Sequence, residues 1–137
     1  MNISVNAILL YSIVVATVLI YLPFLVVAYG RFQIGYDPSA PRANFEKLPP
    51  YAQRATWAHQ NTLEAFPIYA AAALMAYGTG VDSTLAVGAA IGFTIARLFY
   101  SVFYIANIAI GRSLMFGIGS VSSFTLFVLS LLTLSPS

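Results

Sequence analysis

Side chains that could bind or activate a ligand are concentrated in the stretch RATWAHQNTLEAFP, residues 54–67. The chain is 60% hydrophobic and only 7% charged, yet this stretch holds an arginine, a histidine, two amides and a glutamate. Arg54, Trp57, Asn61 and Glu64 recur at spacings of three and four residues, which places them on one face of a helix. Such a face could bind a ligand that carries several hydrogen-bonding groups.

A second polar stripe lies in the C-terminal half, where Arg97, Tyr100 and Tyr104 recur at spacings of three and four residues. An isolated charge at the centre of a bilayer costs about 2.5–3.5 kcal/mol. Counted from the same membrane surface, Glu64 and Arg97 would lie about 16 and 19 Å deep at 1.5 Å per helical residue. We therefore expect Glu64 to pair with Arg97 inside the bundle. Asn61, Tyr100 and Tyr104 would then line a polar pocket that opens toward that surface.

Four apolar segments must position these side chains, and about 20 helical residues suffice to cross a bilayer. The chain is long enough for one domain. Residues 30–52 carry half of the charged residues, so we expect this segment to be a loop. Asn107 would extend the second polar stripe, and Gly111 is expected to end the third helix. The sequence thus predicts an all-α membrane protein, a four-transmembrane-helix bundle with spans at about residues 7–29, 53–78, 84–110 and 113–134.

Basic residues gather on two of the connections between these spans. The loop and the start of the second helix carry Arg31, Arg42, Lys47 and Arg54, and the turn before the fourth helix carries Arg112. The 78–83 turn and both termini carry no lysine or arginine. The positive-inside rule therefore predicts that the long loop and the third connection are cytoplasmic and that both termini are non-cytoplasmic.

The composition argues against several other classes of function. The net charge is only +2 and no basic run is present, so we expect no nucleic-acid partner. The chain has no cysteine, so any thiol chemistry would need a thiol that arrives on a ligand. His59 is the only histidine, so no metal site is expected.

The motifs AHQNTLEAFP, ARLFYSVFY and GRS, in this order, resemble the MAPEG superfamily (membrane-associated proteins in eicosanoid and glutathione metabolism). The loop GYDPSAPRANFEKLPPYAQRA is similar to that of bacterial members, and the resemblance covers nearly the whole chain. It implies a homotrimer of left-handed four-helix bundles, with glutathione bound between neighbouring subunits near the cytoplasmic face. It also implies a bacterial inner membrane, or a thylakoid-type internal membrane, as the location.

The resemblance further implies roles for individual residues. Arg112, which begins the fourth helix, would hold the glutathione thiol as a thiolate and is the expected catalytic residue. The expected glutathione-binding residues are Arg31, Arg54, Asn61, Glu64, Arg97, Tyr100, Tyr104 and Ser113. The sequence departs from the family where members carry an arginine four residues before the helix 2 asparagine or immediately before it. Trp57 and Gln60 occupy these positions, and Arg54 is the expected substitute.

Two hypotheses about function follow. The first is a glutathione-dependent transferase or peroxidase that acts on lipophilic electrophiles drawn from the bilayer, since a thiolate is a stronger nucleophile than a thiol. The alternative is a non-catalytic trimeric scaffold, or an accessory subunit of a larger membrane complex, with a relic ligand pocket. A transporter is less well supported, because four short-looped helices offer no pair of broken helices.

Overall fold

The computed structural model describes residues 2–135 of the chain. Four long helices and one short 3-10 helix follow one another, with bounds α1 (Val5–Ile34), η1 (Pro41–Lys47), α2 (Pro50–Thr79), α3 (Thr84–Ile105) and α4 (Ala109–Leu134). The expected all-helical architecture is confirmed.

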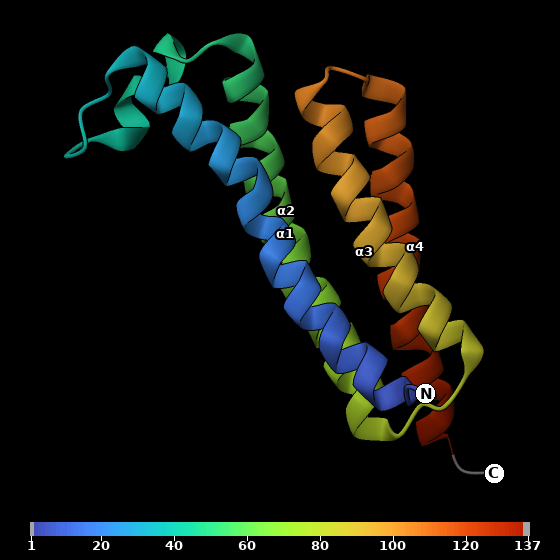
Figure 1. The fold of residues 1–137 in the computed structure, drawn as a ribbon. Coiled ribbons are helices and arrows are strands. Elements are labelled where there is room, and N and C mark those ends of the chain that lie inside the picture. Colours follow the sequence, from blue (N-terminus) through green and yellow to red (C-terminus); the bar gives the residue numbers. More distant parts are fainter. Residues whose placement is uncertain (1, 136–137) are drawn as a thin grey trace.

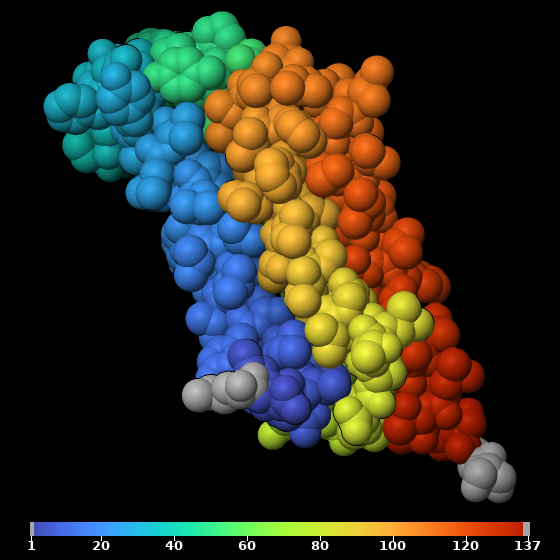
Figure 2. Space-filling view, turned by 45° about the vertical axis from the view of Figure 1, so that its right-hand side comes forward, coloured from blue at the N-terminus to red at the C-terminus, as the bar shows by residue number. Residues whose placement is uncertain are grey.

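The long helices form two antiparallel hairpins, which lie farther apart at one end of the bundle than at the other. Helices α1 and α2 form one hairpin and α3 and α4 the second, and their ribbons diverge toward the end that carries η1 and the α3–α4 turn (Figure 1). Both ends of the described chain lie at the opposite end, beside the α2–α3 turn. Figure 2 shows that side chains of α1 and α3 meet along much of the bundle. We call the two ends the loop end and the terminal end.

Small side chains allow the helices to approach closely near the terminal end. Ala72, Ala73 and Ala76 come from the apolar half of α2 and are fully buried. Tyr69 stacks flat against Phe93, with ring centroids 3.8 Å apart, and its hydroxyl is hydrogen-bonded to Ser12 of α1. These contacts join three helices in one core and anchor the deep part of α2.

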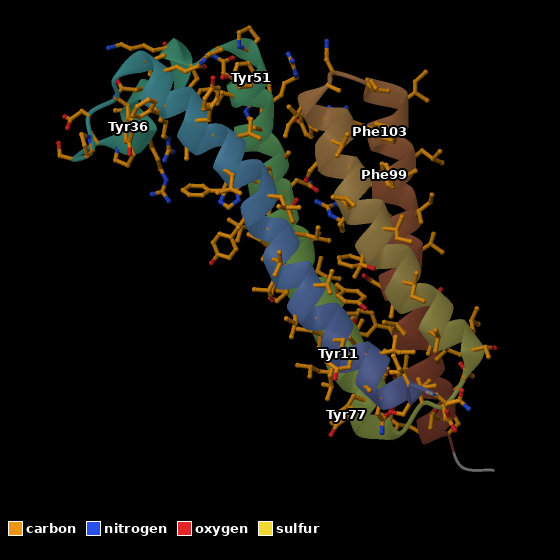
Figure 3. All side chains as sticks on the ribbon, in the orientation of Figure 1. Tyr11, Tyr36, Tyr51, Tyr77, Phe99 and Phe103 are labelled. Atoms are coloured by element: carbon orange, nitrogen blue, oxygen red, sulfur yellow. The ribbon has the colours of Figure 1, made fainter. Side chains whose placement is uncertain are left out.

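Three of the helices are long and apolar enough to cross a membrane: α1, α3 and α4. Helix α2 has 30 residues, but its first half holds the polar stretch and is less apolar. Tyrosines lie at both ends of the bundle, with Tyr36 and Tyr51 at the loop end and Tyr11 and Tyr77 toward the terminal end (Figure 3). Such aromatic residues are typical of membrane–water boundaries. The protein is therefore an integral membrane protein.

The boundary between α3 and α4 differs from the expected one. Helix α3 ends at Ile105 rather than near residue 110, because Asn107 adopts a left-handed conformation (φ 63°). The Ile108 amide then donates to the Phe103 carbonyl at 2.8 Å, and the Asn107 amide donates to Tyr104 at 3.1 Å. Asparagine tolerates this conformation better than most residues, and the two bonds close a Schellman motif. The expectation that Asn107 extends the polar stripe of α3 was wrong.

Gly111 was expected to break a helix, but it lies within the first turn of α4. A Cβ atom at this position would lie 2.7 Å from the Phe103 ring, so the glycine permits close packing of α3 and α4. Phe99 and Phe103 follow one another along α3 beside α4 in Figure 3. Gly35 and Gly80 supply the left-handed residues that end α1 and α2.

Candidate functional site

Arg97 is the centre of the polar cluster and is only 2% exposed. Its Nη2 donates to Asn61 Oδ1 at 3.0 Å and to Thr62 Oγ1 at 2.9 Å. The prediction that Glu64 pairs with Arg97 was therefore wrong, because Asn61 and Thr62 accept the hydrogen bonds of this guanidinium. Asn61 and Thr62 are adjacent on α2, so both can reach one planar fork of donors. Two neutral acceptors also avoid burying a second charge, whereas Glu64 remains exposed.

A ladder of arginines and tyrosines extends from Arg97 toward the loop end. The Arg97 Cζ atom lies 4.0 Å from the ring centroid of Tyr100, and Tyr100 meets Tyr104 edge-on with centroids 5.6 Å apart. The Arg112 Cζ atom lies 4.6 Å from the Tyr104 centroid. Each cation faces the negative face of an aromatic ring, which is a favourable arrangement. The structure thus connects these four predicted site residues in one array.

Arg112 and Ser113 lie in the first turns of α4. The Arg112 amide donates to the Ile108 carbonyl at 3.0 Å, and its side chain is half-buried against Tyr104. Ser113 is exposed beside it. The start of a helix carries partial positive charge, so this position can stabilise an anion together with the guanidinium.

A cavity of about 430 Å³ opens between α2, α3 and α4. Asn61, Glu64 and Arg97 form its charged and amide-bearing end, and Ser120 and Ser123 of α4 add two hydroxyls to its wall. Glu64 and Arg97 therefore share this cavity although they are not hydrogen-bonded partners. Most of its remaining wall is apolar and comprises Ala65, Ile68, Phe93, Phe116, Phe124 and Phe127. The expected pocket was polar and ran toward the loop end past Tyr100 and Tyr104. The observed cavity instead extends from Arg97 toward the terminal end, and those tyrosines do not line it.

Two of the predicted binding residues lie elsewhere. The Arg54 Nε donates to the carbonyl of Ile105 at 3.0 Å, where it caps the last turn of α3. Cations are favourable at helix C-termini, so this contact ties α2 to α3. Arg31, on α1, contacts Phe24 and lines a separate cavity against α2.

His59 also has a structural partner. Its Nδ1 lies 2.8 Å from the Ile20 carbonyl, and a carbonyl can only accept, so Nδ1 carries the proton. The carbonyl belongs to the turn of α1 that Pro23 interrupts. Proline removes a backbone donor and opens neighbouring carbonyls, which other groups then satisfy. No group of three or more His, Cys, Asp or Glu side chains within residues 2–135 could hold a metal ion.

Thr62 is a site residue that the sequence reasoning missed. It lies off the stripe formed by Asn61 and Glu64, and it is nearly fully buried. Its hydroxyl donates to the Ala58 carbonyl at 2.7 Å while it accepts from Arg97. The sequence did contain a signal for this role, because a buried guanidinium needs more than one acceptor and Thr62 directly follows Asn61.

These features define a helical membrane protein with a buried arginine, an arginine–tyrosine ladder and an adjoining apolar cavity. The MAPEG family profile matches residues 8–132, which is nearly the whole chain. The chain therefore belongs to the MAPEG family. No curated protein matches it significantly.

Proposed function

We propose that this protein is a glutathione-dependent transferase or peroxidase that acts on lipophilic electrophiles in the membrane. The observation that carries the proposal is the ladder from Arg97 through Tyr100 and Tyr104 to Arg112, which adjoins a cavity between three helices. Membership of the MAPEG family supports a role in glutathione-related or eicosanoid-related chemistry.

In the proposed reaction, Arg112 acts on the sulfur of bound glutathione. A thiol with a reference pKa of about 8.5 is mostly protonated at neutral pH, and the thiolate is the nucleophile. The guanidinium and the start of α4 both favour the anion. The sulfur lone pair then forms a carbon–sulfur bond to the electrophile, and the leaving group departs with the electron pair of the broken bond.

The shape of the cavity supports a lipophilic second substrate. Its aromatic wall comes mainly from α4, with Phe93 from α3, and its aliphatic wall comes from α2. Phe116 and Phe127 are about 16 Å apart along α4 at 1.5 Å per residue. An apolar group from the bilayer could occupy this length. The exposed carboxylate of Glu64 and the amide of Asn61 stand at its polar end and would accept hydrogen bonds from a ligand amine.

A homotrimer is part of the proposal. The outer face of α2 carries Gln60 and Glu64 followed by Pro67, Ala71 and Gly78, all of them exposed. A carboxylate that faces lipid is unfavourable, and small residues permit close helix contact, so we propose that other copies cover this face.

The charge distribution supports a proposed orientation, and the family resemblance supports a proposed location. Five of the six Lys and Arg residues lie on α1, η1, α2 and α4 near the loop end. We propose that this end is cytoplasmic, that both termini are non-cytoplasmic, and that the protein resides in a bacterial inner membrane or a thylakoid-type internal membrane.

A direct test measures stabilisation of the purified protein by glutathione. At 100 times the dissociation constant, a ligand adds about 2.7 kcal/mol of stability. The wild type should show this shift, whereas Glu64→Gln should need a higher glutathione concentration. Equal amounts of S-methylglutathione control for binding without a titratable thiol.

The catalytic role of Arg112 needs its own test. Arg112→Ala should leave glutathione-induced stabilisation nearly intact while the thiolate absorbance at neutral pH and the turnover both fall. Arg112→Lys should restore them in part, because it keeps the charge but loses the planar donors. Identical thiolate titrations for the three proteins with glutathione bound would contradict the assignment.

The alternative is a scaffold or an accessory subunit of a larger membrane complex. The Arg54 Nε is engaged with the Ile105 carbonyl, and Trp57 and Gln60 occupy the positions where family members carry an arginine. This observation favours a weakened grip on the carboxylates of glutathione. Absence of any stabilisation at millimolar glutathione would favour this alternative.

A further inference from the structure

A second cavity, of about 490 Å³, lies between α1, η1 and α2 at the loop end. It shares no lining residue with the cavity beside Arg97. Its polar groups come from all three elements and comprise Arg31, Arg42, Thr56, His59 and Gln60. No aspartate or glutamate lines it among residues 2–135. The cavity therefore presents two positive charges that no carboxylate in its wall neutralises.

Arg31 is held in this cavity with hydrogen-bonding capacity to spare. Its Cζ atom lies 5.9 Å from the Phe24 ring centroid and 5.8 Å from that of Tyr36. Its Nε is buried and has no hydrogen-bond partner in the described part of the chain. The Arg31 side chain donates no hydrogen bond to the described residues, so its guanidinium is available to an acceptor bound in the cavity.

The rest of the cavity wall is apolar. The long helices contribute Phe24 and Val27 from α1 and Leu63 from α2. Phe45 of η1 packs against Trp57 of α2, with ring centroids 5.6 Å apart. A free phosphate ion would use only the charged groups. A lipid phosphate with its glycerol and the start of an acyl chain would use both kinds of wall.

We propose that this cavity binds the headgroup of an anionic phospholipid from the leaflet at the loop end. Arg31 and Arg42 would contact the phosphate, because guanidinium groups match phosphate oxygens in geometry and charge. Basic pockets of membrane proteins on the cytoplasmic side recognise anionic lipids in this way. The proposal does not depend on the thiol chemistry proposed above.

Trp57 provides a built-in probe, since it is the only tryptophan and lines the cavity. The full chain is reconstituted in phosphatidylcholine bilayers that contain increasing fractions of brominated phosphatidylglycerol or, in parallel, brominated phosphatidylcholine. Bromine quenches tryptophan at close range, so selective quenching by the phosphatidylglycerol measures preferential binding. We expect clear selectivity for phosphatidylglycerol in the wild type.

Arg42→Gln should lower this relative binding constant about five-fold, the contribution of one basic group at an anionic surface. Arg42 is exposed on η1, so the change should leave the unfolding temperature unchanged. Lys47→Gln is the matched control, because Lys47 also lies on η1 but does not line the cavity. Arg31→Gln combined with Arg42→Gln should remove the selectivity.

Several results would overturn the proposal. Equal quenching of the wild type by the two brominated lipids would show that no anionic site exists. An equal loss in Lys47→Gln and Arg42→Gln would show a general surface attraction instead of a site. If millimolar inorganic phosphate or glutathione abolished the selective quenching, the cavity would accept a soluble anion rather than a lipid.

Discussion

The two ends of the bundle use opposite means to hold four helices together. Toward the terminal end, buried alanines and the stacked pair of Tyr69 and Phe93 form a dense apolar core. Toward the loop end, directed polar contacts join the helices: Arg54 to the α3 terminus, His59 to α1 and Arg97 to α2. Apolar packing constrains volume, whereas a hydrogen bond constrains a particular pair of atoms.

This comparison explains why the polar stretch of α2 can lie in an apolar chain. Arg54, His59, Asn61 and Thr62 each bond to another helix, so most of its polarity is satisfied inside the protein. Glu64 is exposed in the same stretch and faces a cavity. The loop end therefore combines structural polar groups with one carboxylate that remains accessible to a ligand.

The largest effect should follow from removing the partners of Arg97. Asn61→Leu combined with Thr62→Val should cost about 3–6 kcal/mol, because two hydrogen bonds to a charged group are lost and each contributes about 1.5–3 kcal/mol. The free energy of unfolding can be measured in mixed micelles titrated with SDS. Adding Arg97→Leu should recover part of the loss, since no buried charge then remains unpaired.

Glu64→Gln is the control for this prediction, and we expect it to change stability by less than about 1 kcal/mol, as is usual for an exposed group. A cost as large as that of the Asn61 and Thr62 double variant would show that the carboxylate, not the two neutral acceptors, stabilises the guanidinium.

A smaller effect is expected in the alanine-rich core near the terminal end. Ala72→Leu should destabilise the protein by about 1–3 kcal/mol, because extra methylene groups must force apart packed helices. Ala71→Leu, at the neighbouring exposed position, is the matched control and should cost little in the monomer. Unfolding temperatures in one detergent suffice for the comparison. Similar losses at both positions in a monodisperse trimer would instead show that the α2 face is covered by another subunit.

A smaller effect again is expected where α3 meets α4. Gly111→Ala should cost about 1 kcal/mol, at the lower end of the range for overpacking, because the Phe103 ring can move aside in part. Gly117→Ala has open space around its Cβ position and should be neutral or slightly stabilising. If both variants were equally stable, the glycine at 111 would not be required for packing.

The sequence allowed the helices and the two polar stripes to be predicted because membrane spans and helical periodicity are local properties. The grouping of Arg97, Tyr100, Tyr104 and Arg112 followed from spacing together with the family resemblance. Local patterns did not show which acceptor Arg97 would select, since that depends on the rotation of α2 against α3. For the same reason the structural partners of Arg54 and His59 were not foreseen.

The smallest effect concerns the turn that the sequence reasoning misplaced. Asn107 is the left-handed residue that ends α3. It thereby sets where α4 begins and where Arg112 lies. Asn107→Gly should keep or slightly raise stability, because glycine adopts this conformation without strain. Asn107→Ala should lower it by up to about 1 kcal/mol, since a left-handed conformation is costly for a residue with a Cβ atom. Thermal unfolding of the three proteins measures the difference. If the alanine and glycine variants had equal stability, the turn would not depend on its left-handed residue. The ladder of arginines and tyrosines would then be positioned by α3–α4 packing alone.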